Sequence, residues 1–183
     1  MRSWVFWRGH ERLRAQIFNR VPKYGNDIIA IETAGNVPYG NFIETLPFTD
    51  LLLYDIKMMD EEKHKQWTGV SNKKILENLR RLAKSHVEII IRVPLITGVN
   101  DGKEFEAIAD FAARLPNVNE LHILPYHTVG RSKYDQLGMD YAIECIEEEN
   151  DDEVEHCRRY AEAKGLRVSV GGAGFAPKKD MAG

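Results

Sequence analysis

From residue 28 onward, short runs of branched apolar residues alternate with longer segments that carry apolar residues at helical spacing. The short runs are continuously apolar, which is typical of strands buried on both faces of a parallel sheet. They predict five strands, over residues 28–33, 51–57, 87–93, 120–125 and 166–170. The repeated order of strand, helix and strand favours an α/β fold with βαβ crossovers and a parallel sheet or partial barrel.

Three of the longer segments predict amphipathic helices. The first follows Ser71-Asn72, which we expect to cap its N-terminus, and the second follows Asp101-Gly102. The third spans residues 154–164 and ends at Gly165, a residue type common after a helix C-terminus. These helices fall between the predicted strands, as crossovers require.

Residues 1–27 differ in composition from the rest of the chain. They carry six Lys or Arg residues and two acidic ones, whereas the whole chain of 183 residues has a net charge of -3. We therefore divide the chain into an atypical N-terminal segment, 1–27, and an α/β domain, 28–183. A helix over residues 10–20 is one interpretation of the first segment.

Charge and hydropathy exclude several classes of function. The acidic body lacks the basic patch that binding to nucleic acid requires. No apolar run approaches the roughly 18 residues of a membrane span, and no apolar stretch of a secretory signal follows the N-terminal charges, so we expect a cytoplasmic protein. The two cysteines, Cys145 and Cys157, are too few for a disulfide framework.

Ionisable side chains stand at the carboxyl ends of four predicted strands. In parallel sheets and barrels these ends meet at one edge, where ligands bind. The five residues would form an edge of mixed charge suited to a ligand with both a carboxylate and an ammonium group: Glu32, Asp55, Lys57, Arg92 and His127.

Simpler interpretations of these residues remain open. Asp55 and Lys57 are two residues apart, so they share a face of a strand and could form only a local ion pair. His127 could be a structural histidine. Lys57 could also form a Schiff base in a small barrel lyase, with Asp55 as its proton partner. A non-catalytic binding module is a further alternative.

Six stretches in register resemble the C-terminal part of the glycyl-radical-enzyme activating enzymes, radical SAM proteins typified by pyruvate formate-lyase activating enzyme. The resemblance runs from about residue 29 to residue 172. The matching stretches are Glu32-Thr33-Ala34-Gly35, residues 50–57, Gly69-Val70-Ser71-Asn72, Ile91-Arg92-Val93-Pro94-Leu95-Ile96, Gly98-Val99-Asn100-Asp101 and Leu124-Pro125-Tyr126-His127.

The resemblance implies a partial (β/α)6 barrel, S-adenosylmethionine and a four-iron four-sulfur cluster as cofactors, and a glycyl radical enzyme such as pyruvate formate-lyase as partner. It also implies flavodoxin or ferredoxin as electron donor. Asp55 and Lys57 would be the catalytic residues, near the cation, the cofactor and the incoming glycine loop, and Arg92 and His127 would contact S-adenosylmethionine. Glu32 and Thr33 would lie beside its ammonium group, and with Asp55 beside a monovalent cation.

The chain departs from the family pattern at the cluster. It lacks the Cys-x3-Cys-x2-Cys loop and the Gly-Gly-Glu-Pro motif, and Cys145 and Cys157 lie beyond the fourth predicted strand. We therefore expect a barrel truncated at its N-terminal strands that holds no cluster and is inactive alone. A frameshift ahead of residue 28 would explain residues 1–27, with a genuine divergent helix as the alternative. The exposed flank of strand 28–33 would then favour a homodimer.

Overall fold

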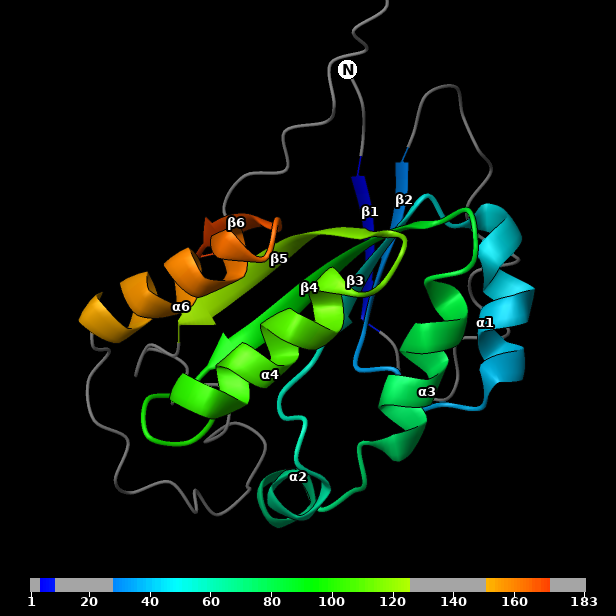
Figure 1. The fold of residues 1–183 in the computed structure, drawn as a ribbon. Helices are drawn as coiled ribbons and strands as arrows, with labels where there is room; N and C mark the ends of the chain where they lie inside the picture. Colours follow the sequence, from blue (N-terminus) through cyan, green and yellow to red (C-terminus); the bar gives the residue numbers. More distant parts are fainter. Residues whose placement is uncertain (1–3, 9–27, 126–150, 172–183) are drawn as a thin grey trace, which may run out of the picture.

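The computed structural model describes residues 4–8, 28–125 and 151–171 (Figure 1). Six parallel strands form one sheet, in which each strand pairs with the next along the chain. The strands are β1 (Trp4–Arg8), β2 (Ile28–Thr33), β3 (Leu51–Asp55), β4 (Glu88–Leu95), β5 (Val118–Pro125) and β6 (Arg167–Val170).

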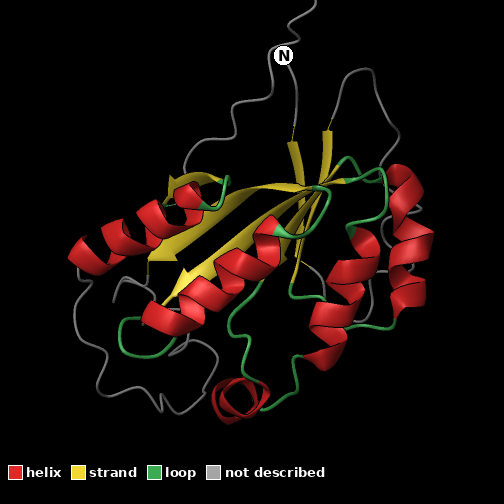
Figure 2. Ribbon diagram, viewed as in Figure 1, coloured by secondary structure: helices red, strands yellow, loops and turns green. Residues whose placement is uncertain are grey.

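The helices are α1 (Tyr39–Thr45), the 3-10 helix η2 (Leu46–Phe48), α2 (Glu61–Thr68), α3 (Lys73–Leu82), α4 (Gly102–Ala113) and α6 (Asp151–Ala163). Helices α1, α3, α4 and α6 lie on one face of the sheet, whereas α2 lies below the strands in this view (Figure 2). Helix α6 has 13 residues, and no helix in the described part of the chain is long and apolar enough to cross a membrane. The unbroken strand order and the one-sided helices agree with the expected α/β fold.

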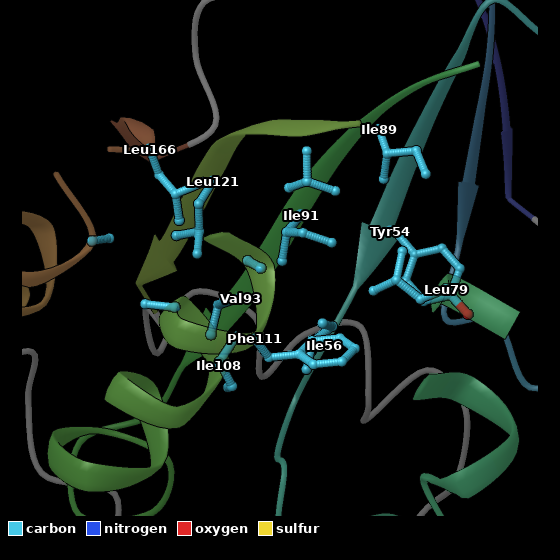
Figure 3. Close-up of a cluster of buried hydrophobic side chains, with 14 of the residues drawn as sticks. Tyr54, Ile56, Leu79, Ile89, Ile91, Val93, Ile108, Phe111, Leu121 and Leu166 are labelled. Atoms are coloured by element: carbon cyan, nitrogen blue, oxygen red, sulfur yellow. The ribbon is translucent and has the colours of Figure 1, made fainter. Parts of the chain in front are cut away.

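The hydrophobic core fills the space between the sheet and its helices (Figure 3). Strand residues such as Leu52 and Ile91 point into it and meet Leu79 from α3 and Ile108 from α4. Tyr54 is also fully buried there, and its hydroxyl donates a hydrogen bond of 2.7 Å to the carbonyl oxygen of Ile75. That bond satisfies the one polar atom that the ring brings into the core.

The sequence predicted β2 to β6 and helices α3, α4 and α6, with differences at their ends, but it did not predict β1, α1 or α2. All five predicted strands form, although β3 ends at Asp55 and β4 continues to Leu95. Helix α3 follows Asn72 as expected, but the Asn72 side chain makes no capping bond. Its amide instead donates to the carbonyl oxygens of Met58 and Met59, because the side chain is buried under the loop after β3.

Strand β1 contradicts one expectation for the N-terminal segment. The flank of β2 is not exposed, because β1 pairs with it in parallel, from Trp4 opposite Ile28 to Arg8 opposite Glu32. The dimer predicted from that exposed flank therefore loses its stated basis. The predicted helix over residues 10–20 lies outside the described residues.

Gly35 generates a stability prediction. It has a φ of +71°, and a Cβ atom added there would lie 1.6 Å from the Tyr54 hydroxyl oxygen. Gly35→Ala therefore adds a steric clash to the backbone strain, and we expect it to lower the free energy of unfolding by about 2 to 4 kcal/mol in urea titrations.

Gly69→Ala is the matched control. Gly69 has a φ of +76° but has nothing within 4 Å of an added Cβ. It should cost only the backbone strain, about 1 kcal/mol. Equal losses in the two variants would contradict the close packing of Gly35 against Tyr54.

Candidate functional site

The sheet face opposite the helices changes from apolar to charged along the strands. Near its middle, four buried residues form a small cluster, namely Ala30, Leu51, Leu53 and Ile90. Side chains on one face of a strand recur every two residues. Two residues further toward the carboxyl ends, the same face carries Glu32, Asp55 and Arg92, the last two directly opposite each other in the sheet.

Arg92 joins the two carboxylates, and we call these three residues the charged triad. Its Nη2 lies 2.5 Å from Oε1 of Glu32 and 2.7 Å from Oδ1 of Asp55. Its Nε also donates to Oδ1 of Asp55, at 2.8 Å. Three neighbouring strands, β2, β3 and β4, are thereby linked by one guanidinium group through charge-assisted hydrogen bonds.

The triad is largely shielded from water. The side chains of Arg92, Asp55 and Glu32 are 14%, 18% and 20% exposed. Burial alone lowers the pKa of Arg92, but the hydrogen bond to Glu32 and the charge of Asp55 outweigh it, so the net shift is upward. The guanidinium group therefore stays protonated at any physiological pH.

Two polar atoms of the triad remain available. No hydrogen bond to another described residue uses Nη1 of Arg92 or Oδ2 of Asp55. The triad therefore offers unused N–H donors on a cation beside an unused oxygen on an anion. Such a pair can bind the carboxylate and ammonium groups of an amino acid at the same time.

The structure brings together three of the five residues predicted at the strand ends. Glu32 and Asp55 stand on neighbouring strands, and the side chain that bonds to both is Arg92 rather than Lys57, which the sequence offered as an ion-pair partner of Asp55. Arg92 can bond to both, because its long side chain extends from the adjacent strand. Lys57 is half-buried, and its ammonium group makes no hydrogen bond or ion pair with the described residues.

The remaining predicted residues are not part of the triad. Thr33 is opposite the core residue Tyr54 in the sheet, and its hydroxyl accepts a hydrogen bond from the Gly35 amide at 3.0 Å. In this structure Thr33 therefore shapes the turn after β2. His127 lies outside the described residues, so its expected ligand contact stays a prediction.

Sequence analysis missed a second polar group on the same face. His122 is opposite Arg92 in the sheet, is 1% exposed and bonds through Nε2 to Oε1 of Glu120 at 2.7 Å. Glu120 also pairs with Arg167 of β6, at 2.9 Å. The alternation of Glu120, Leu121 and His122 within a predicted strand was the available signal for this group.

The described residues do not fit an iron–sulfur cluster. Cys157 of α6 belongs to the core between the sheet and the helices, on the other side of the sheet from the triad. Burial, with a smaller effect of Glu153, raises the pKa of its thiol to about 12, whereas a metal ligand must be a thiolate. Among the described residues, no group of three His, Cys, Asp or Glu side chains could hold a metal ion. Cys145 lies outside them.

Curated relatives match most of this chain. The trans-4-hydroxy-L-proline dehydratase activating enzyme of Clostridioides difficile is 36% identical over 147 residues, which cover 79% of this chain and 48% of that protein. The pyruvate formate-lyase 2-activating enzyme of Escherichia coli strain K12 is 34% identical, over 78% of this chain and 49% of that protein. The chain thus spans about half the length of these relatives.

Solved structures agree with this similarity. A domain of pyruvate-formate lyase-activating enzyme from Bacteroides vulgatus superposes with a TM-score of 0.66 and 29% identity, over 79% of this chain and 81% of that one. A radical SAM methyltransferase from Sphaerobacter thermophilus, at 17% identity and a TM-score of 0.59, shares the fold over 78% of this chain and 39% of that one. No family model matches the chain.

We expect Arg92→Gln to lower the free energy of unfolding by about 3 kcal/mol at pH 7, because two shielded carboxylates lose their common cation. Urea titration at pH 7 measures the effect.

Arg158→Gln provides the control for this variant. Arg158 also bridges two glutamates, Glu155 and Glu162, but on the exposed surface of α6. Exposed pairs contribute little, so this variant should lose less than about 1 kcal/mol. A loss at Arg92 no larger than that at Arg158 would contradict a structural role for the triad.

Proposed function

Because the matched part of this chain belongs to the glycyl-radical-enzyme activating enzymes of the radical SAM superfamily, we propose that it supplies the S-adenosylmethionine contacts of such an enzyme. The proposed scaffold is a partial (β/α)6 barrel. Consecutive parallel strands with helices on one face support it, since a doubly wound sheet has helices on both faces.

The observation that carries the proposal is the charged triad with its two available polar atoms. The methionyl end of S-adenosylmethionine is a zwitterion. In our proposal its carboxylate accepts hydrogen bonds from Nη1 of Arg92, and its ammonium group donates to Oδ2 of Asp55. Glu32 keeps the guanidinium group oriented from the other side through its bond to Nη2.

The predicted roles of the neighbouring residues stay part of the proposal. His127 would add a ligand contact, and Thr33 would act through the turn that it shapes after β2. Lys57 would lie close both to S-adenosylmethionine and to the glycine that reacts. A monovalent cation at Glu32 and Asp55 would have to displace Arg92, which already neutralises both carboxylates.

When bound in such enzymes, S-adenosylmethionine is the source of a 5′-deoxyadenosyl radical. The described residues do not fit the cluster that reduces it, so we assign them binding and orientation only. That this chain is inactive without the cluster remains a prediction.

We propose a glycyl radical enzyme as the partner. The relatives' names refer to different enzymes, among them trans-4-hydroxy-L-proline dehydratase, isethionate sulfite-lyase and pyruvate formate-lyase. Because those enzymes catalyse different reactions, we propose only the class of the partner and not an individual enzyme. A flavodoxin or ferredoxin donor, a cytoplasmic location and pairing of two copies stay predictions.

No contact in the described residues favours the Schiff-base alternative. A lyase of that kind would use Asp55 as the proton partner of Lys57. Both bonds to Oδ1 of Asp55 come from Arg92, and Lys57 contacts no described carboxylate. The lyase and the non-catalytic binding module therefore remain hypotheses from the sequence.

Titration of the full chain with two ligands tests the proposal. S-adenosylmethionine carries the zwitterion, whereas 5′-methylthioadenosine has the same nucleoside without it. We expect Asp55→Asn to weaken binding of S-adenosylmethionine about tenfold, because a charge-assisted hydrogen bond is lost, and to leave 5′-methylthioadenosine unaffected. Isothermal titration calorimetry or NMR line shifts give the two dissociation constants.

Glu88→Gln serves as the control, since Glu88 lies on the same face at the other end of β4 and is exposed. It should leave both affinities unchanged. Equal binding of the two ligands by the unmodified chain would show that the zwitterion contributes nothing and would overturn the proposal.

A further inference from the structure

Asn100, in the loop between β4 and α4, is buried, with an exposed fraction of 2%. Its Nδ2 donates two hydrogen bonds of 2.8 Å, to the carbonyl oxygens of Lys57 and Pro94. Its Oδ1 accepts a hydrogen bond of 2.7 Å from the Ile96 amide. Three of the four hydrogen bonds that an asparagine side chain can make are therefore directed at backbone.

The two carbonyl groups belong to the strand ends that carry the triad. Lys57 follows Asp55 by two residues, and Pro94 follows Arg92 by two residues. The last backbone hydrogen bond between these strand ends runs from the Ile56 amide to the carbonyl oxygen of Arg92, at 2.9 Å. Asn100 connects the two chain segments directly beyond this bond, where backbone hydrogen bonds between them have ended.

Asn72 and Asn78, the other asparagines that are buried in the described part of the chain, have a different geometry. Asn72 bonds to two carbonyls in the loop after β3, those of Met58 and Met59. Asn78 bonds to two carbonyls in the loop after β2, those of Gly35 and Val37. Each holds one loop, whereas Asn100 joins the segment directly after β3 to strand β4.

We propose that Asn100 is a positioning residue for Lys57. By holding the Lys57 carbonyl against β4, it fixes the backbone from which the ammonium group extends, two residues beyond Asp55 and beside a strand that carries Arg92. The described residues offer that ammonium group no partner, so the hydrogen bond from Asn100 to the Lys57 carbonyl is the contact that limits where the side chain begins. The inference rests on the proposed function, because the ligand of the triad is what Lys57 would meet.

Asn100→Asp removes the two donors, keeps the shape of the side chain and keeps the acceptor for Ile96. We expect the Ile56 amide to exchange with solvent about tenfold faster in this variant, since the strand ends separate locally. The amide of Ile91, in the middle of β4, should be unchanged. Hydrogen exchange followed by NMR measures both rates in the full chain without any ligand.

Asn117→Ala is the control for general destabilisation. Asn117 directly precedes β5, so it lies at the opposite ends of the strands. Its amide also donates two hydrogen bonds, to the carbonyl oxygens of Ser85 and Val87. It should lower stability without changing exchange at Ile56. If exchange at Ile56 rises equally in both variants, or in neither, Asn100 does not fix this strand end and the inference is wrong.

A double-mutant cycle on S-adenosylmethionine affinity tests whether Asn100 acts through Lys57. Asn100→Asp and Lys57→Met should each weaken binding, and the double variant should be no weaker than Lys57→Met alone. Additive losses would overturn the inference. If the unmodified chain does not bind S-adenosylmethionine, the proposed function fails, while the exchange rates at Ile56 still decide whether Asn100 holds the strand end.

Discussion

The guanidinium group of Arg92 is the interaction on which the arrangement of the site depends. Glu32 and Asp55 stand on neighbouring strands of a sheet whose polar face excludes much of the solvent, and two carboxylates so placed would repel each other. Arg92 bonds to both from the third strand. It therefore sets the orientation of both acids and limits how the carboxyl ends of β2, β3 and β4 can move relative to each other.

The two faces of the sheet have different roles, because one packs against the helices and the other carries the charged residues. The helix-covered face is apolar and contains the core, which leaves no room there for an unpaired charge. The opposite face has only a small apolar cluster, followed by the charged triad and by the group formed by Glu120, His122 and Arg167. Buried asparagines then fix the loops between the two layers, because each amide satisfies backbone carbonyls that would otherwise be buried without partners.

Much of the site could be predicted from the sequence, and the errors have physical causes. Position at a strand end correctly predicted that Glu32, Asp55 and Arg92 lie together, since parallel strands deliver these ends to one edge. Because Lys57 is close to Asp55 in the sequence, it was suggested as the partner of that carboxylate. The partner is instead Arg92, which is directly opposite Asp55 on the neighbouring strand and has a side chain long enough to bond to it. Asn72 was expected to cap α3, but its side chain is buried under the loop after β3 and donates its hydrogen bonds to the carbonyl oxygens of that loop.

Strand β1 shows the limit of local pattern most clearly. Its sequence, Trp-Val-Phe-Trp-Arg, is rich in residues that favour strands, but it lies in a segment that was set apart for its charge and composition. Its pairing with β2 is a non-local interaction that no window of sequence contains. By itself, the sequence determined the order of strands and helices, the parallel sheet and the edge at which charged residues gather, because periodicity and chain order express these directly. Only the tertiary structure decided which charges bond to each other and which asparagine links two strands, because register and side-chain reach are set when the strands meet.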